Sequence, residues 1–359
     1  MRLGILASIV VLALAAASPG EEPARWTLEL ELNGKQVEGS PLAWDDSRVE
    51  LLLRDGKVLT FAPSEASGFR KSSSSFRSFS LGEFRKRLTQ ELGAGFEISG
   101  TGHYIVAHPH GQRDYWSPRF EELYRSFVHY FSARGFRLTE PEFPLVAIVF
   151  RNQHDFLQYA RKEGARIGPD AKGYYSPDTN RVCLFDVSGG NANADNWHDH
   201  AETIIHEATH QTAFNTGVHR RFSAVPAWAV EGLATMFEAP GVWNSRQHTA
   251  RGDRLNQGRL IQFQRHLERR KSDSLVDLIS SDRRFDLDPG AAYAESWAFS
   301  FFLAETQPRK YTQYLALTAR RPPFADCTPV ERMADFTEVF GKDLKMLDAH
   351  FLRFMAEIK

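Results

Sequence analysis

Two stretches of the 359-residue chain decide its interpretation. Residues 204–217 read Ile-Ile-His-Glu-Ala-Thr-His-Gln-Thr-Ala-Phe-Asn-Thr-Gly, and residues 226–234 read Pro-Ala-Trp-Ala-Val-Glu-Gly-Leu-Ala. The first stretch contains two histidines, His206 and His210, four positions apart in an apolar helical pattern. Residues with this spacing lie on one face of a helix, so both imidazoles can reach one ion. Glu207 lies beside them, where it can take a proton from metal-bound water.

The second stretch supplies the third metal ligand that the first one lacks. A third histidine six residues beyond His210 would define a different class of zinc enzyme, but Thr216 occupies that position. Glu231 is the better candidate, because it lies among apolar residues of a helix opened by Pro226, where a carboxylate needs a partner. Zinc suits two imidazoles and one carboxylate, with a fourth position left open. We therefore predict a Zn²⁺ site made of His206, His210 and Glu231, with Glu207 as the general base.

The combined pattern resembles a known family. A His-Glu-x-x-His motif, followed about twenty residues later by Trp-x-x-Glu-Gly-x-Ala, is similar to the gluzincin group of zinc metallopeptidases. It looks most like an exported bacterial branch of that group, a domain of unknown function. The resemblance is strongest over residues 200–240 and weaker over about 100–310. It implies a thermolysin-like zincin core, in which a small mixed β-sheet precedes a mainly helical lobe.

The resemblance also implies roles for residues outside the two stretches. Gly173-Tyr174-Tyr175 looks like the edge strand that pairs with an extended peptide substrate in such enzymes. Tyr293 resembles the tyrosine of a later helix, which donates a hydrogen bond to the oxyanion of the tetrahedral intermediate. The alternative for Tyr293 is a core tyrosine with a satisfied hydroxyl group.

The sequence departs from the family pattern in two places. Thr235 stands where some gluzincins carry an aspartate that orients a ligating histidine, and Glu202 or Glu238 is the alternative for that role. The Gly-x-Met-x-Asn segment of the aminopeptidase branch is absent from the sequence. The implied activity is therefore that of a zinc endopeptidase. The alternatives are a non-catalytic zincin-fold binding or assembly protein of the cell surface, and a zinc hydrolase of non-protein amides.

The N-terminus carries a targeting pattern. Arg2 precedes an apolar run, Ile5 to Ala17, that ends in small residues, which is typical of a secretory signal peptide over residues 1–20. At roughly 13 residues the run is short for a membrane span, which needs about 20. We expect a protein exported to the periplasm, the cell surface or the medium, with no transmembrane segment after signal removal.

The rest of the chain divides into three parts. Alternating patterns and an Asn-Gly turn predict a small β-rich domain over residues 21–66. The serine-rich stretch 67–82 is typical of a flexible linker. Residues 83–359 form the predicted metallopeptidase domain, with a β-rich part at about 95–187 and a helical part at about 195–359. Strands followed by helices indicate an α+β fold.

The composition limits which classes of partner the protein is expected to bind. The formal net charge is −1, and no long basic block is present, which argues against a nucleic-acid partner and leaves a peptide or protein substrate. Short basic runs such as Arg269-Arg270-Lys271 are typical of solvated helix ends. The two cysteines, Cys183 and Cys327, permit either one disulfide bond or two buried free thiols. The oligomeric state stays open.

Overall fold

The computed structural model describes residues 25–188 and 197–358, and of residues 197–200 the backbone alone. The predicted signal peptide, residues 1–20, lies outside the described residues. The chain divides into two compact units, one of residues 1–87 with 178–180, the other of residues 88–177 with 181–359. Among the described residues, no helix combines the length and the apolar character that crossing a bilayer requires.

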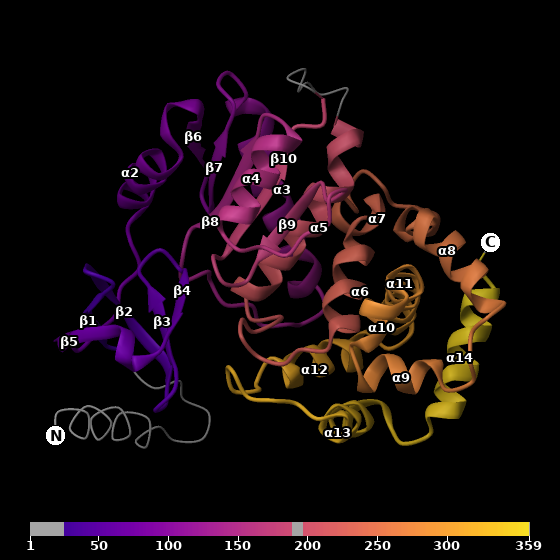
Figure 1. The fold of residues 1–359 in the computed structure, drawn as a ribbon. Helices are drawn as coiled ribbons and strands as arrows, with labels where there is room; N and C mark the ends of the chain where they lie inside the picture. The colour runs from indigo at the N-terminus through magenta and orange to yellow at the C-terminus, as the bar shows by residue number, and fades with distance from the viewer. Residues whose placement is uncertain (1–24, 189–196, 359) are drawn as a thin grey trace. The chain divides into compact units, whose positions relative to one another are not determined.

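The first unit is a five-stranded antiparallel sheet in the order β4-β3-β2-β1-β5 (Figure 1). Its strands are β1 (Thr27–Leu32), β2 (Lys35–Trp44), β3 (Val49–Leu53), β4 (Val58–Phe61) and β5 (Ala66–Ser73). The hairpin between β1 and β2 turns at Asn33 and Gly34, both with positive φ (51° and 75°), as a two-residue hairpin turn requires.

The serine-rich stretch 67–82 is not wholly a linker, which corrects the prediction from composition. Its first part belongs to β5, which pairs antiparallel with β1 along the edge of the sheet. Phe69 packs against the core of this sheet, and the hydroxyl group of Thr27 donates to the Ser75 carbonyl oxygen at 2.7 Å. The serines provide no hydrophobic alternation, so the backbone pairing with β1 decides the conformation. The stretch ends in α2 (Leu81–Leu92), a helix that composition did not predict.

The second unit begins with a mixed five-stranded sheet in the order β6-β7-β8-β10-β9. Its strands are β6 (Glu97–Gly100), β7 (Tyr104–His108), β8 (Leu145–Phe150), β9 (Gly173–Ser176) and β10 (Arg181–Phe185). Strands β7, β8 and β10 run parallel, while β6 and β9 pair antiparallel at the two edges. The parallel pairs are connected through α3 (Arg113–Ser132) and α4 (Gln153–Lys162).

Successive residues of β10 face opposite sides of this sheet, as in any strand. Val182 and Leu184 join the main hydrophobic core together with Ile204 of the following helix. Phe185 instead lies 5.6 Å, between ring centroids, from Phe156 of α4. Cys183 is buried and free, and Cys327 is free and only partly buried, so neither a disulfide bond nor two buried thiols is found.

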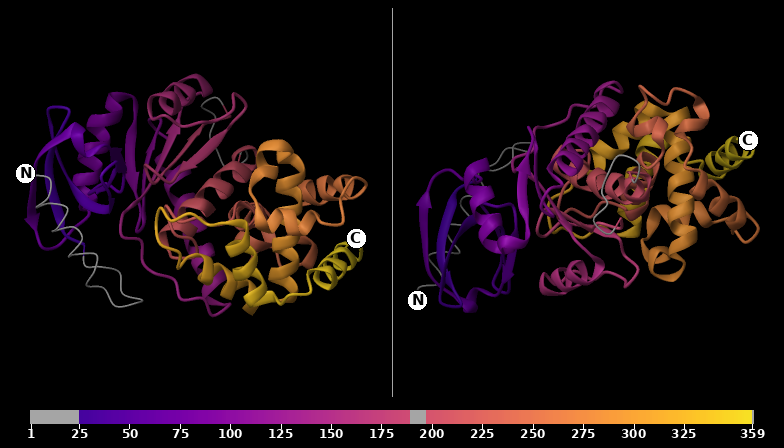
Figure 2. Two further views of the ribbon diagram at one scale, coloured as in Figure 1. Left: turned by 60° about the horizontal axis from the view of Figure 1, so that its bottom comes forward. Right: turned by 90° about the horizontal axis from the view of Figure 1, so that it is seen from above.

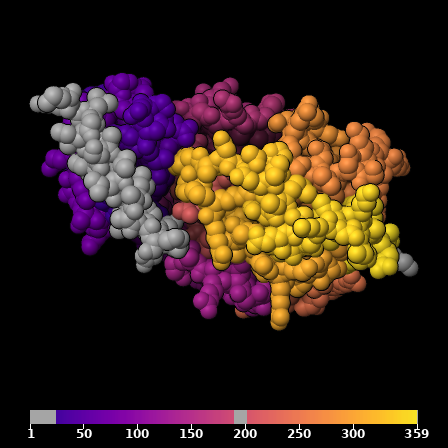
Figure 3. All heavy atoms as spheres, turned by 90° about the horizontal axis from the view of Figure 1, so that it is seen from below, coloured from indigo at the N-terminus to yellow at the C-terminus, as the bar shows by residue number. Residues whose placement is uncertain are grey.

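The rest of the second unit is helical and lies to one side of the sheet (Figure 2). The helices are α5 (Trp197–Asn215), α6 (Ala227–Phe237), α7 (Pro240–Trp243), α8 (Gln257–Leu267), α9 (Ser274–Ser280), α10 (Arg283–Leu287), α11 (Pro289–Thr306), α12 (Pro308–Thr318), α13 (Pro329–Phe340) and α14 (Leu344–Ala356). The last three form a contiguous yellow-orange layer on one face (Figure 3). The coarse expectation, an α+β chain with a β-rich N-terminal region and a helical C-terminal lobe, is therefore confirmed.

Helix α11 is the centre of the helical lobe and packs closely on α6. Its residues from Ala294 to Ala304 are all buried. Gly232 of α6 makes the close approach possible, since a methyl group at this position would stand 2.5 Å from the Ser296 carbonyl oxygen and would also meet the Ser300 hydroxyl group. The residue before this glycine is Glu231, so the contact between the two helices also fixes the place of that carboxylate.

Candidate metal centre

Helices α5 and α6 bring the three predicted ligands together. The Nε2 atoms of His206 and His210 lie 3.0 Å apart, and the Oε2 atom of Glu231 lies 3.3 Å from the first and 3.4 Å from the second. These three residues, the metal triad, form a group able to hold a metal ion. Ligands about 2.0–2.1 Å from a tetrahedral zinc ion would stand about 3.3 Å from one another, which matches the observed triangle.

The chemistry of the triad also fits a cation at its centre. Glu231 Oε2 is buried and has no hydrogen-bond partner among the described residues. The two imidazole nitrogens lie 3.3 and 3.4 Å from it, farther than the ~2.7–2.9 Å of a charge-assisted hydrogen bond. A buried carboxylate oxygen without a partner is costly. Two imidazole nitrogens and this oxygen converge on one point, which is the donor set that zinc prefers.

Glu238, at the end of α6, orients the first of the ligating histidines. Its side chain is 5 % exposed, and its Oε1 atom lies 2.8 Å from His206 Nδ1. When Nδ1 carries the shared proton, Nε2 presents a lone pair to the metal. The Oε2 atom of Glu238 accepts a hydrogen bond of 2.5 Å from Asn256. Glu238 is therefore the orienting carboxylate, because the alternative, Glu202, is exposed. Thr235 does not take this role, since its hydroxyl group donates to the backbone oxygen of Glu231.

The charges of the site are strongly coupled. Burial alone would lower the pKa of His206, but Glu231 and Glu238 raise it well above its usual value. Burial likewise opposes ionisation of Glu231, yet the two histidines hold the pKa of this carboxyl well below its usual range. The triad therefore keeps its carboxylate ionised, as a metal ligand must be.

Glu207, the predicted base, lies between the triad and the edge of the sheet. Burial raises the pKa of its carboxyl, while the nearby His206 and His210 oppose that rise. The backbone N–H of Tyr175 in β9 donates a hydrogen bond to the Glu207 carboxylate. Because β9 is the edge strand of the described sheet, the strand that was expected to receive a peptide lies beside Glu207.

Tyr293, on α11, also lies at the metal triad. Its ring centroid is 6.5 Å from that of His206. Burial raises the pKa of Tyr293, and the charges of Glu231 and Glu207 add to the rise, so the hydroxyl group stays protonated as a donor. The ring is held edge-on by Phe285 of α10 at 5.4 Å.

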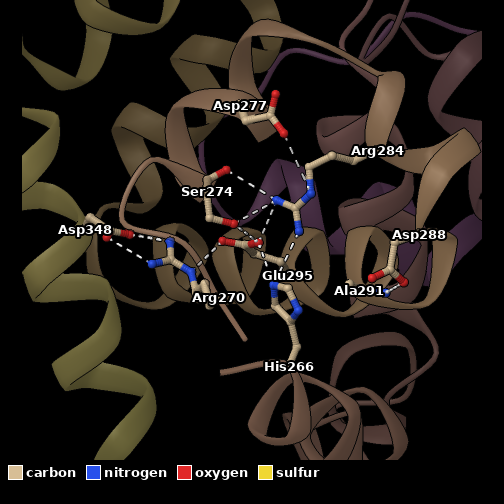
Figure 4. A network of polar contacts seen from close by, with 9 residues as sticks. All are labelled: His266, Arg270, Ser274, Asp277, Arg284, Asp288, Ala291, Glu295 and Asp348. Carbon is tan, nitrogen blue, oxygen red and sulfur yellow. Dashed lines mark hydrogen bonds and ion pairs between the residues drawn. The ribbon is translucent and has the colours of Figure 1, made fainter. Parts of the chain in front are cut away.

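A buried polar cluster, which the sequence did not indicate, anchors α11 (Figure 4). We call it the Glu295 cluster; its members are Glu295, His266, Arg270, Ser274, Arg284 and Asp348. Glu295 is fully buried and pairs with Arg270 at 2.8 Å and with Arg284 at 2.7 Å. Arg270 also reaches Asp348 of α14 at 2.5 Å. Its side chain is 4 % exposed, so this member of the basic run Arg269-Arg270-Lys271 is not the solvated helix end that was expected.

The cluster links α11 to the elements around Tyr293. Arg284 lies next to Phe285, which packs on the tyrosine ring, and His266 belongs to α8. Although burial opposes ionisation, the hydrogen bond from His266 and the charges of Arg270 and Arg284 lower the pKa of Glu295 to about 2. An acid inside the apolar run of α11 was the signal in the sequence, but its four direct partners, His266, Arg270, Ser274 and Arg284, come from other segments of the chain.

His219 is a further buried histidine close to the triad. It is 1 % exposed, and burial, helped by the charge of His210, lowers the pKa of its imidazole to about 3. It does not join the three ligands. This agrees with the absence of a histidine at the third-ligand spacing of the other zinc class.

A cavity of about 470 Å³ opens beside the His206–Glu238 pair. Glu202 and Ile205 of α5, Glu238, Trp243 of α7 and Asn256 line it, among others. The cavity gives the site a mixed apolar and acidic recess next to the ligating histidine.

Comparisons with known proteins add little beyond this geometry. A family model described as a protein of unknown function, DUF1570, matches residues 200–325. This stretch includes the whole triad, Glu207, Glu238 and Tyr293, but less than half of the chain. A search of curated proteins finds no significant match.

Among solved structures, the chain is similar to two variant structures of an M1 zinc metallopeptidase from Deinococcus radiodurans, one of them bound to a Tyr-Ser-Ala substrate. The identity is 13 % and the TM-score 0.37, over 73 % of this chain. The chain spans about half the length of those structures, 50 % and 51 %. This likeness is too distant to carry a functional argument.

Proposed function

We propose that this chain is a zinc-dependent peptidase of the gluzincin type, with a thermolysin-like core. One observation carries the proposal: the metal triad has an acid, Glu207, placed between it and the edge strand of the sheet. Three protein ligands leave the fourth position of zinc open, as in catalytic sites, whereas structural sites are closed by four. A triad alone would support binding of a metal; the adjacent base and the edge strand support hydrolysis of a peptide.

The residues then take the following roles. His206, His210 and Glu231 would hold the zinc ion, which supplies Lewis acidity that polarises a carbonyl group and acidifies a water molecule. Glu207 accepts the proton of the attacking water and delivers it to the leaving amine. The Tyr293 hydroxyl group donates a hydrogen bond to the oxyanion.

The substrate follows from the edge strand. Strand β9 is the edge on which an extended peptide or protein would pair in the manner of an added strand. An endopeptidase fits best, since such pairing does not require a free terminus. Export through the signal peptide at residues 1–20 and the absence of a nucleic-acid partner belong to the same proposal.

Metal analysis tests the first half of this proposal. Purified wild type should contain about one zinc ion per chain, and Glu231→Ala should lose most of it while staying folded. Glu202→Ala is the matched control, because it removes an exposed carboxylate from α5 and should leave the zinc content unchanged. Absence of zinc in the wild type, or full retention of zinc in Glu231→Ala, would contradict the proposed metal site.

A peptide-library digest followed by mass spectrometry tests the second half. Metal-dependent cleavage that phenanthroline abolishes would establish a peptidase. Zinc binding without cleavage of any peptide would favour a non-catalytic surface protein, and cleavage of wall amides alone would favour the other hydrolase class.

A further inference from the structure

Arg259 places a positive charge one aromatic ring away from the metal triad. It is the third residue of α8, and its guanidinium carbon lies 5.2 Å from the ring centroid of Tyr293. The centroid of the same tyrosine ring lies 6.5 Å from that of His206. Arg259 and the ligating His206 are therefore neighbours of one tyrosine ring, which places the cation next to the site where the scissile bond would lie.

The first turn of α8 is fixed in place by the same residues that support the metal triad. Asn256 caps the helix by accepting a hydrogen bond of 3.1 Å from the backbone N–H of Arg259. The Asn256 amide group also donates to Glu238 at 2.5 Å and to the Thr235 carbonyl oxygen at 3.1 Å. The backbone of Arg259 is thus held relative to the ligating histidine and does not depend on a loose surface turn.

The Arg259 side chain has no carboxylate partner within the described part of the chain. Its side-chain hydrogen bond goes from Nη1 to the neutral Gln262 Oε1 atom at 3.0 Å. Arg270 and Arg284, from the neighbouring elements, are different: each is paired with Glu295. Arg259 is only partly exposed, and a partly buried cation without a counter-charge is poised to bind one.

The chemistry of the partner follows from the guanidinium group. It presents five N–H donors in a planar fork, of which the contact with Gln262 uses one, and the fork matches a carboxylate through two parallel hydrogen bonds. We propose that Arg259 is a specificity-determining residue that binds a carboxylate of the substrate beside the scissile bond. This inference rests on the proposed peptidase function. The carboxylate comes either from the C-terminus of the peptide or from an aspartate or glutamate side chain.

Paired peptides test the proposal and separate the two sources. The probes are peptides of one length that end in a free carboxylate or a carboxamide, and that carry Glu or Gln at each position in turn. Wild type should prefer the carboxylate member of one pair by roughly 10-fold or more in kcat/KM. Preference for the free terminus over the amide identifies the C-terminus, and preference for Glu over Gln identifies a side chain.

Two variants assign the preference to this residue. Arg259→Gln should lose the preference while keeping its zinc and its fold. Arg265→Gln is the matched control, since it removes an exposed arginine from the same helix, and should retain the preference. A wild type that is indifferent to the carboxylate, or a preference that survives in Arg259→Gln, would overturn the proposal.

Equilibrium binding separates this inference from the peptidase proposal. The same peptide pairs are titrated into zinc-loaded Glu207→Gln, with and without Arg259→Gln, by calorimetry. Tighter binding of the carboxylate peptide by roughly 10-fold, lost with Arg259→Gln, supports the site even if no peptide is ever cleaved. Equal affinities within each pair refute it, whatever the cleavage assay shows.

Discussion

His206 and Glu238 face each other across two helices, with Nδ1 and Oε1 2.8 Å apart. The contact joins the metal triad to Asn256 and the start of α8. Replacing a group that orients a ligating histidine typically lowers the affinity for the metal by about 10- to 100-fold.

The first prediction therefore concerns Glu238. Glu238→Gln should weaken zinc binding about 10- to 100-fold, because the amide is a poorer acceptor for the imidazole N–H than the carboxylate. Competition with a chromophoric chelator measures the affinity. Glu202→Gln, with its exposed side chain, serves as the control. Equal zinc affinity in Glu238→Gln and wild type would show that this contact has no bearing on the metal.

The second prediction separates metal binding from catalysis. Glu207→Gln should keep the zinc ion, since Glu207 is not one of the three ligands, and should lose about 10²- to 10⁴-fold in kcat, the usual contribution of a general base. Zinc content and peptide hydrolysis are measured on the same preparation. Hydrolysis at the wild-type rate would exclude Glu207 as the base.

The third prediction concerns the contact between α6 and α11. Gly232→Ala should lower the free energy of unfolding by about 1–3 kcal/mol, because the added methyl group meets backbone and side-chain atoms of α11. Gly258→Ala, in a helix where the methyl group approaches only Asn256 Oδ1 at 3.5 Å, should be neutral or stabilising by up to about 1 kcal/mol. Urea denaturation compares them, and equal stabilities for the two variants would contradict the tight packing.

The fourth prediction is a pH dependence of stability from the Glu295 cluster. The pKa of Glu295 is about 2 in the folded protein, below the value of about 4.3 in an unfolded chain. The unfolded state therefore binds more protons between these values. The stabilisation, of the order of 3 kcal/mol, is complete above about pH 4.3 and is lost as the pH falls toward 2.

Comparison with Glu295→Gln measures this contribution. The variant should be less stable than wild type at pH 6, because it removes the carboxylate that two buried arginines share and leaves Arg270 only Asp348. The difference in stability should narrow below about pH 4. Glu268→Gln, an exposed carboxylate at the end of α8, should show no such change. A difference that stays constant from pH 6 to pH 3 would mean that Glu295 does not titrate as described.

The sequence was most informative where the chemistry depends on local spacing. The separation of four between His206 and His210 places both on one helix face whatever the rest of the chain does. Glu231 was predictable because an isolated acid in an apolar helix needs a partner. The structure places these residues together, as it does Tyr293, whose place was implied by resemblance alone.

The features that the sequence did not specify depend on distant contacts. Glu238, and not Glu202, orients His206 because α6 ends against α5. Asn256, 18 positions further along the chain, holds the Glu238 carboxylate in place. Strand β5 forms because β1 offers it an unpaired edge, which composition cannot show. The partners of Glu295 come from segments that precede α11, and Arg270 links it to Asp348 of α14 at the far end of the chain.

Helix α11 turns two different faces to its surroundings, and this has a consequence for the last helix of the chain. Tyr293 and Glu295 are two positions apart, so about 200° of rotation separates them on the helix: one faces the metal triad while the other faces the Glu295 cluster. The last member of that cluster along the chain, Asp348, lies in α14. The contact between α6 and α11 also places Glu231, so the last helix of the chain supports the ligand and the tyrosine together. Chains truncated before Leu344 would then lose zinc affinity and activity in parallel, although the missing helix contributes no residue to the metal triad.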